Sequence, residues 1–462
     1  MGRGLQSSLA VASTGLVARL AVVAWAGHRF PPAHDGVRYD ALGARLAEGL
    51  GYTWLWPDGT VTVVAHYPVG YPALLALAFH ALGHSVVAAG VLNALLGALA
   101  ALAVHRMVLA VATPRTALVA GLAVALHPGL VLYAPAIMTE GATAALVAIA
   151  AWLAVVQVEP RPATRGRLVL LGVALGVAGL VRPQSLLVAP PFGALAGRWK
   201  GAAMAVAVAA LVCAPWVARN AASVGRWTLS TNAGWNLLIG AQDGASGGWQ
   251  EVHVPPACEG VFGESASDAC FGREARADIA ARPGRWLALA PRKLAATFDY
   301  GGIGGYYLNL SNPGAFPWRA VLVAGGIETL YERLALGACL LGAAAASGPR
   351  RTPRRWVAAT GAVFLVVPWG WVAVVALCAA LALLGARWLE AHPVHGATLG
   401  ALATTAGVHA VFFGAPRYAL VAAPLVTALA VVSLAERVQL RRAARDGVKQ
   451  IELPSVGEGE AP

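Results

Sequence analysis

Charged residues are scarce in this sequence. Only 12% of its 462 residues are Asp, Glu, Lys or Arg, against about 25% in ordinary soluble domains. Apolar residues account for 58%, and the mean hydropathy is +0.64. So little polar surface cannot coat a water-soluble globule of this length. The composition therefore predicts an integral membrane protein that crosses the bilayer many times.

Several familiar signatures are absent as well. The sequence has no HExxH, no CxxC, no Walker A motif and no GxGxxG, so no zinc centre or nucleotide site is indicated. It also lacks the short alternating segments that build a transmembrane barrel. The first apolar run has no signal-peptide cleavage pattern, and we expect it to be an uncleaved span.

Long apolar runs predict an all-α polytopic fold of about twelve transmembrane helices. Ala, Leu and Val favour helix, and about 20 such residues cross the bilayer while every backbone group is bonded within the segment. The pairs 166–198 and 356–389 can each be one long helix, two short helices or a re-entrant hairpin. The expected spans are 9–27, 88–111, 115–134, 138–157, 166–182, 183–198, 201–219, 319–346, 356–370, 371–389, 397–414 and 417–436.

The net charge of +12 reports topology rather than a nucleic-acid partner. Basic residues gather in alternate loops, which is the positive-inside pattern, so we expect these loops to lie against anionic cytoplasmic lipid. An even number of spans places both termini in the cytoplasm. The basic positions are Arg106, Arg115, Arg161, Arg165, Arg167, Arg198, Lys200, Arg350, Arg351, Arg354, Arg355, Arg437, Arg441, Arg442, Arg445 and Lys449.

This topology divides the chain into four regions. We expect an N-terminal transmembrane module (1–219) with a first outside, periplasmic loop (28–87), then a long outside loop (220–318), C-terminal transmembrane helices (319–436) and a cytoplasmic tail (437–462). Within the first loop, 38–50 is an amphipathic stretch, and the apolar run from Tyr71 suits a helix lying in the interface. Cys258 and Cys270 can form a disulfide if the long loop faces an oxidising compartment.

Two acidic residues stand at the outer ends of these segments. Asp35 and Tyr39 are four apart and share a face if that stretch is helical. Asp35 can cap a helix over 36–48, act in catalysis, or do both. Glu140 begins the fourth span, where a carboxylate suits a helix N-terminus. It lies on the same side as Asp35, so the two can also face one cavity.

Three arginines break the positive-inside trend. Arg182, Arg219 and Arg417 lie at outer span ends in short apolar contexts. The planar guanidinium bonds two oxygens at once, so together they favour a bound phosphate. The alternatives are snorkelling to lipid headgroups and pairing with a carboxylate such as Glu140.

Two further features are weaker. His66 is a candidate ligand of a divalent metal, although a lone histidine is more often a hydrogen-bonded structural residue. The tract STNAGWNLLIGAQDGASGG, residues 230–248, can wrap a polar ligand or simply form a surface loop with tight turns.

These motifs, in this order, resemble the membrane glycosyltransferases of the GT-C superfamily, especially bacterial relatives of protein O-mannosyltransferases and the lipid A aminoarabinose transferase. The resemblance covers nearly the whole chain. The matching pieces are Asp35 and Tyr39 with LAEGLG, then YPVGYPALL, Thr139-Glu140, Arg182-Pro183, PWVARN, the tract 230–248, and Arg417-Tyr418 with Pro424.

The resemblance implies an enzyme of the bacterial cytoplasmic membrane that takes a sugar from a polyprenyl phosphate and transfers it, with inversion, to a lipid, glycan or protein acceptor on the outer face. Asp35 would act as general base or orient the acceptor. Arg182, with Arg219 and Arg417, would hold the departing phosphate. Tyr39, Glu140 and Tyr418 would also bind substrate, and Glu140 could orient the acceptor, bind a metal or anchor Arg182. Gly36 follows Asp35 where many relatives have a second acid, and His66 stands near a relative's acidic metal ligand, which leaves metal dependence open.

The competing class is a transporter or flippase of a lipid-linked substrate. A transporter places ionisable residues near mid-membrane and often has inverted repeats with broken helices. Here the ionisable residues lie at the outer edge and no repeat is evident. Arg19, within the first span, is the exception, and it can equally serve a structural role.

Overall fold

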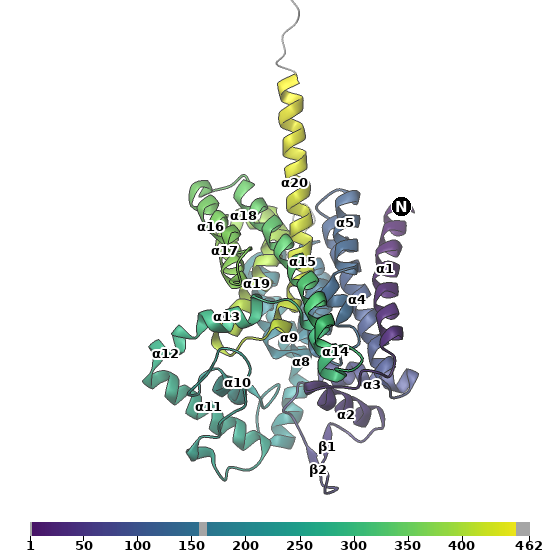
Figure 1. Ribbon diagram of the computed structural model, residues 1–462, viewed down its shortest axis with the longest axis vertical. Helices are drawn as coiled ribbons and strands as arrows, with labels where there is room; N and C mark the ends of the chain where they lie inside the picture. The colour runs from purple at the N-terminus through teal and green to yellow at the C-terminus, as the bar shows by residue number, and fades with distance from the viewer. Residues whose placement is uncertain (1, 157–163, 450–462) are drawn as a thin grey trace, which may run out of the picture.

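The computed structural model describes residues 2–156 and 164–449 and is almost entirely helical (Figure 1). Arg161 and the end of the expected tail lie outside these residues. The α-helices are α1 (Gly2–Ala26), α2 (Asp35–Ala47), α3 (Gly70–Leu82), α4 (Val86–Leu109), α5 (Pro114–Ala125), α6 (Pro128–Leu132), α7 (Thr139–Val155), α8 (Arg165–Val181), α9 (Ala189–Val224), α10 (Ala233–Ile239), α11 (Glu264–Ala281), α12 (Pro283–Ala288), α13 (Ala290–Phe298), α14 (Ile303–Ser311), α15 (Trp318–Ala345), α16 (Arg351–Val363), α17 (Gly370–Ala382), α18 (Ala386–Ala391), α19 (Pro393–Val411) and α20 (Ala423–Lys449). The 3-10 helices are η1 (Pro183–Val188), η2 (Pro256–Cys258) and η3 (Pro416–Val421), and β1 (Thr53–Leu55) pairs antiparallel with β2 (Val61–Val63).

Helix starts follow ordinary capping chemistry. The Ser85 side chain accepts from the Ala88 amide at 3.1 Å and begins α4. Thr113 does the same for Thr116 at 3.2 Å, with Pro114 as the first helical residue of α5. A side-chain oxygen satisfies an amide that the first turn leaves without a helical partner. The sequence thus sets the turn between these two helices.

Three described helical segments are long and apolar enough to cross a membrane by length and composition: Gly4–Ala26, Val86–Leu109 and Pro183–Val224. The chain is thus a multi-pass membrane protein, while the number of twelve spans stays a prediction. The helices pack through small residues. Gly172 and Gly176 of α8 leave so little room that an added Cβ would lie 2.5 Å and 2.6 Å from Val208 and Val212 of α9. Such close backbone approach is typical of helix pairs in membranes.

Several predicted span limits are wrong in detail. The expected span 115–134 stops at Ala125, and a separate short helix, α6, begins at Pro128. The expected spans 183–198 and 201–219 become η1 and a single α9, kinked at Arg198, whose φ is +53°. Gly385, at φ +81°, separates α17 from α18 within the expected span 371–389. Proline and left-handed residues interrupt helices that hydropathy alone reads as continuous.

The polar segments gather at one end of the molecule. In Figure 1, α2, the hairpin β1–β2 and α10 to α12 lie at the end opposite to the N-terminus and the outer part of α20. The predicted helix over 36–48 is present as α2, and the apolar run from Tyr71 is present as α3. The hairpin at 53–63 was not predicted. Residues 28–87 and 220–318 thus meet at the same end of the helical bundle.

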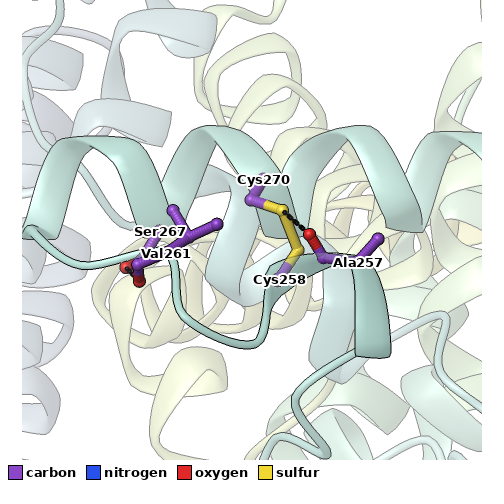
Figure 2. Close-up of a disulfide and its surroundings, with 5 residues drawn as sticks. All are labelled: Ala257, Cys258, Val261, Ser267 and Cys270. Carbon is purple, nitrogen blue, oxygen red and sulfur yellow. Dashed lines mark hydrogen bonds between the residues drawn. A yellow bond between two sulfur atoms is a disulfide. The ribbon is translucent and has the colours of Figure 1, made fainter.

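The two loop cysteines are joined. Cys258, in η2, and Cys270, in α11, form a disulfide across a separation of 12 residues (Figure 2). Beside it, the Ser267 hydroxyl donates to the Val261 carbonyl at 3.0 Å. The bond closes the loop in front of α11 and supports a small apolar cluster that includes Leu238 and Phe271. A short loop sealed in this way loses less chain entropy on folding.

Candidate functional site

Prolines position two arginines at helix ends. Arg182 precedes Pro183, and its extended backbone (φ −143°, ψ 109°) ends α8. Ala415 is extended before Pro416 in the same way, so that η3 starts there and carries Arg417. A residue before proline is pushed out of the helical region by steric clash. Each Xaa-Pro pair thus ends the segment before it and begins a 3-10 helix. Arg182 and Arg417 stand at the starts of these two helices.

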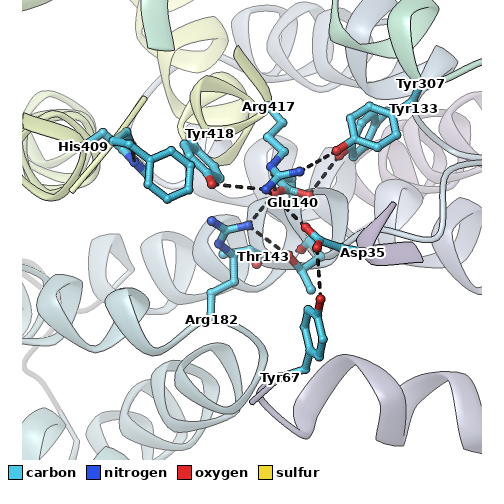
Figure 3. Close-up of polar contacts among 12 residues, drawn as sticks. Asp35, Tyr67, Tyr133, Glu140, Thr143, Arg182, Tyr307, His409, Arg417 and Tyr418 are labelled. Carbon is cyan, nitrogen blue, oxygen red and sulfur yellow. Dashed lines mark hydrogen bonds and ion pairs between the residues drawn. The ribbon is translucent and has the colours of Figure 1, made fainter. Parts of the chain in front are cut away.

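Glu140 is the centre of the resulting cluster. Its side chain is 1% exposed, and Arg182 Nη1 lies 2.6 Å from Oε1. Arg417 Nε lies 3.3 Å from the same oxygen, and the Tyr133 hydroxyl donates to Oε2 at 2.9 Å. Figure 3 shows both arginines pointing at this carboxylate. The buried charge is thus paired and hydrogen-bonded, as a carboxylate removed from water requires.

Arg417 links this buried carboxylate to Asp35 at the start of α2. Its Nη2 lies 3.3 Å from Asp35 Oδ2 and 3.2 Å from the Tyr418 hydroxyl, and Nη1 donates to the Tyr307 hydroxyl at 2.5 Å. Asp35 is the most open member of the cluster, with a third of its side chain exposed (33%). The two predicted acids, Asp35 and Glu140, are therefore bridged by a single guanidinium.

Arg182 is held on every side by protein groups. Besides Glu140, Nη1 donates to the Thr139 hydroxyl at 2.9 Å. The Gln184 amide oxygen, turned toward the guanidinium, accepts from Nη2 at 2.9 Å and from Nε at 3.1 Å. The guanidinium carbon lies 4.8 Å from the centre of the Tyr418 ring. These contacts fix its plane, so Arg182 is a preorganised cation.

Asp35 does not cap a helix, so that interpretation is wrong. It is the first residue of α2, whose N-cap is His34, and no side-chain cap bond is present there. Its carboxylate instead accepts from the Tyr67 hydroxyl at 3.2 Å and pairs with Arg417. Burial, with the Asp35 charge beside it, raises the pKa of Tyr67 and keeps that phenol a donor.

The two predicted tyrosines, Tyr39 and Tyr418, line the cluster. Tyr39 is buried edge-on between Tyr67 and Tyr71, at ring distances of 5.1 Å and 5.6 Å. Burial, then the charges of Asp35 and Glu140, raise the Tyr39 pKa. The Tyr418 ring packs on both arginines and stacks on His409 at 3.9 Å.

Arg219 is not brought into this cluster. Its Nη1 donates to the Val64 carbonyl at 2.7 Å and its Nη2 to the Tyr52 carbonyl at 2.9 Å. The guanidinium also lies 4.7 Å from the Trp216 ring. It thus holds both ends of the hairpin segment against α9, and its predicted role toward the substrate stays a prediction.

His66 lies next to Tyr67 of the cluster, among aromatic rings. Its ring is 4.9 Å from Tyr67 and 5.9 Å from Trp235, both edge-on. Within residues 2–156 and 164–449, no group of three or more His, Cys, Asp or Glu is arranged to hold a metal ion. Asp35 and Glu140 meet arginine cations instead. Metal binding by His66 therefore stays a prediction. The described residues offer no second and third protein ligand beside it.

The sequence did not identify several members of the cluster. Tyr133 and Tyr307 bond Glu140 and Arg417, and they lie edge-on to each other at 5.4 Å. Tyr307 is set by α14, whose amides at Gly304 and Gly305 donate to Glu328 at 3.3 Å and 3.4 Å. The only sequence signal was Glu328 itself, an unexplained acid inside the expected span 319–346.

Two small cavities adjoin the cluster. One is lined by Arg182, Gln184 and Tyr418, and the other by Ile137 and Tyr307. With Asp35 partly open, the arrangement offers a carboxylate able to take a proton next to two arginines able to stabilise an anion. Cations fixed in a water-poor site stabilise a developing negative charge without reorganising.

Comparison with family models and with curated proteins gives no match. Among solved structures, the chain is similar to ArnT from Cupriavidus metallidurans bound to undecaprenyl phosphate, at 14% identity over 97% of this chain and 81% of that chain, with a TM-score of 0.40. It is also similar to the archaeal oligosaccharyltransferase AglB from Archaeoglobus fulgidus in complex with an inhibitory peptide and a dolichol-phosphate, at 13% identity over 99% and 52%, with a TM-score of 0.43. The resemblance predicted from the motifs is confirmed to this extent: GT-C superfamily glycosyltransferases are among the solved structures similar to this chain.

Proposed function

We propose that this protein is a glycosyltransferase that moves a sugar from a polyprenyl-phosphate donor to an acceptor hydroxyl at the outer face of the cytoplasmic membrane. One observation carries the proposal. Arg417 joins the buried Glu140 to the partly open Asp35, with Arg182 on the other side of Glu140. An acid–base group thus lies against a pair of anion-binding cations.

The donor phosphate would bind to Arg417 by displacing the Asp35 carboxylate from it. Its contact with Asp35 is long, at 3.3 Å, and lies at the more exposed end of the cluster. The Arg182–Glu140 contact is short, at 2.6 Å, and buried. A phosphate, which accepts two guanidinium hydrogen bonds at once, can therefore replace Asp35 on Arg417 while Glu140 keeps both arginines in place.

That exchange would free Asp35 for the chemical step. Its carboxylate takes the proton of the acceptor hydroxyl, and the hydroxyl oxygen forms a bond to the anomeric carbon. The bond between that carbon and the phosphate oxygen breaks, and its electron pair stays on the leaving polyprenyl phosphate. Attack from the opposite face inverts the anomeric centre. Proton transfer of this kind contributes about 10² to 10⁴ in rate.

No step of this scheme runs through a metal ion. A divalent cation at His66 would add charge stabilisation near the donor if it binds, because cations of that class polarise phosphoryl oxygens. Metal dependence is tested by adding a chelator to the transfer reaction below.

The decisive experiment is a transfer assay with the purified protein in lipid. It uses a panel of labelled polyprenyl-phosphate sugars, membrane extract as acceptor, and the Asp35→Asn variant. Asp40→Asn is the matched control, because Asp40 lies on the same helix but contacts His84 at 3.0 Å, away from the cluster. We expect Asp35→Asn to lose transfer by about 10² or more and Asp40→Asn to retain it.

Two results would contradict the proposal. Full transfer by Asp35→Asn would remove Asp35 as the base. Movement of a labelled donor across the bilayer, without transfer to any acceptor, would instead identify the transporter class. Donor binding by Asp35→Asn, measured separately, distinguishes a lost chemical step from a lost phosphate site.

A further inference from the structure

A second polar cavity lies at the opposite end of the molecule. Its volume is about 370 Å³, and it is formed by the turn before α5, the corner between α18 and α19, and one face of α20. In Figure 1 these elements lie toward the end that holds the N-terminus, away from α2. The lining is part apolar, from three valines, and part polar, from Thr113, His392, His395, Glu436 and Gln439.

His395 offers an unsatisfied group to this cavity. The residue is 2% exposed, yet its Nε2 has no hydrogen-bond partner among the described residues. Its ring packs edge-on against Trp388 at 4.9 Å and against His392 at 5.8 Å. Buried polar atoms in native proteins nearly always have a partner, so an orphan beside a cavity indicates a ligand or water that completes it.

Glu436 faces the same space. It is partly buried, and within the described part of the chain its carboxylate makes no hydrogen bond and no ion pair. Three of the other polar groups have partners in part. His392 Nδ1 pairs with the Trp388 carbonyl at 3.0 Å, and the Thr113 hydroxyl bonds that of Thr116 at 2.8 Å. The groups left for a ligand within the described residues are thus the Glu436 carboxylate, the Nε2 atoms of His395 and His392, and the amide of the exposed Gln439.

The carboxylate and the imidazole nitrogens define the ligand's chemistry, because the Gln439 amide can both donate and accept and so selects no charge. A carboxylate only accepts hydrogen bonds, and a neutral imidazole nitrogen can accept one. An anion would be repelled by Glu436. A metal ion is disfavoured, because no described group of three acidic, thiol or imidazole ligands is present. A primary ammonium fits, since it brings positive charge to the carboxylate and three N–H donors to both acceptors.

We propose that this cavity binds a primary ammonium group, with Glu436 pairing its charge and His395 Nε2 accepting one of its N–H bonds. The ammonium can come from the headgroup of a membrane lipid or from a small free amine. Both sources present the same chemistry to the cavity, and the experiment separates them.

The test measures thermal unfolding of the full-length protein in nanodiscs of three compositions. Phosphatidylethanolamine carries a primary ammonium, phosphatidylcholine carries the same charges without an N–H donor, and phosphatidylglycerol carries no cation. Ethanolamine or choline is then titrated into the phosphatidylglycerol discs. We expect a higher melting temperature with phosphatidylethanolamine than with phosphatidylcholine, or saturable stabilisation by ethanolamine and none by choline.

Variants assign the effect to the cavity. Glu436→Gln should abolish the ethanolamine-type stabilisation or weaken the affinity by about tenfold or more, as expected for a lost charge-assisted hydrogen bond. His395→Phe should weaken it too. Glu390→Gln is the matched control, because Glu390 is on neighbouring α18 but lies 3.8 Å from Arg198, outside the cavity lining. Equal melting of all variants in phosphatidylcholine discs shows that they fold.

The outcomes divide cleanly. A response to phosphatidylethanolamine that Glu436→Gln loses and Glu390→Gln keeps supports a lipid ammonium. A response only to free ethanolamine, with the same dependence on Glu436, supports a soluble amine. No response to either amine, equal responses to ethanolamine and choline compounds, or an unchanged response in Glu436→Gln would overturn the proposal.

Discussion

The molecule buries arginines in two different ways. In the cluster around Glu140, Arg182 and Arg417 meet carboxylates, phenols and a hydroxyl from separate elements. Arg19, which lies on α1 and is 1% exposed, donates hydrogen bonds only to backbone carbonyls among the described residues. Its Nη1 donates to the Gly15 carbonyl at 3.0 Å and to the Ala125 carbonyl at 2.8 Å. The side-chain partners of Arg182 and Arg417 can be replaced by a ligand when side chains move. The backbone carbonyls that bind Arg19 cannot be replaced in this way.

The backbone partners of Arg19 explain its place in the first span. Ala125 is the last residue of α5, where carbonyls lack a helical donor and carry the negative end of the helix dipole. Arg19 satisfies them and so fixes the point at which α5 ends. This buried charge is therefore structural, so Arg19 no longer favours a transporter.

The largest effect should come from removing the charge of Glu140, which lies at the centre of this cluster. Glu140→Gln leaves Arg182 and Arg417 buried without their shared anion. Loss of one partner from a buried ion pair typically destabilises by about 3–5 kcal/mol. The free energy of unfolding in mixed micelles measures this, with the exposed Glu48→Gln as control. A loss no larger than that of the control would show that the arginines are already hydrated.

Removing Arg19 should destabilise the fold without touching the chemistry. Arg19→Met leaves the Ala125 and Gly15 carbonyls without their donor, at about 2–3 kcal/mol for charge-assisted hydrogen bonds. Transfer by the fraction that remains folded should match that of the wild type. A selective loss of transfer or of donor binding at unchanged stability would place Arg19 in the functional machinery and blur the distinction between the two kinds of site.

The exchangeable partners were only partly visible in the sequence. Asp35, Glu140, Arg182 and Arg417 were found because charges at apolar span ends are rare, and the fold brings all four together. The phenols of Tyr133 and Tyr307 were missed. Aromatic residues are ordinary in apolar helices, and the break at Pro128 that turns Tyr133 toward Glu140 is a local event that hydropathy averages away.

The place of a residue at the end of a predicted span also does not determine which neighbouring helices its side chain contacts. Arg219 lies at a span end like Arg417, yet α9 directs it to the carbonyls of Tyr52 and Val64. The same limit affected Asp35, whose place before a helix suggested a cap. Its actual partners, Tyr67 and Arg417, come from segments 32 and several hundred residues away, which no local pattern reports.

Lysine substitutions sharpen this contrast between Arg417 and Arg219. Lys keeps the charge but loses the planar fork that bonds two oxygens. Arg417→Lys should weaken binding of a polyprenyl phosphate by about tenfold, or about 1.4 kcal/mol. Arg219→Lys should leave the affinity unchanged, because its partners are backbone carbonyls. Equal weakening by both variants, measured by lipid-phosphate titration, would bring Arg219 into the donor site as the sequence predicted.

The smallest effect concerns His66, a half-buried residue that lies near the acidic side chains of Glu264 and Asp35. Burial lowers the His66 pKa below its ordinary 6.5, although Glu264 and Asp35 act in the opposite direction. Between the folded and unfolded pKa values the unfolded chain binds more protons, so stability is full above about pH 6.5 and falls as the pH drops through the folded pKa. The slope from one residue is at most about 1.4 kcal/mol per pH unit.

Unfolding between pH 7.5 and 4.5 should show this loss, and His66→Gln should flatten it while exposed His253→Gln does not. A steeper loss in His66→Gln would mean that the carboxylates bind protonated His66, which would make this histidine a cation partner of the cluster like Arg417.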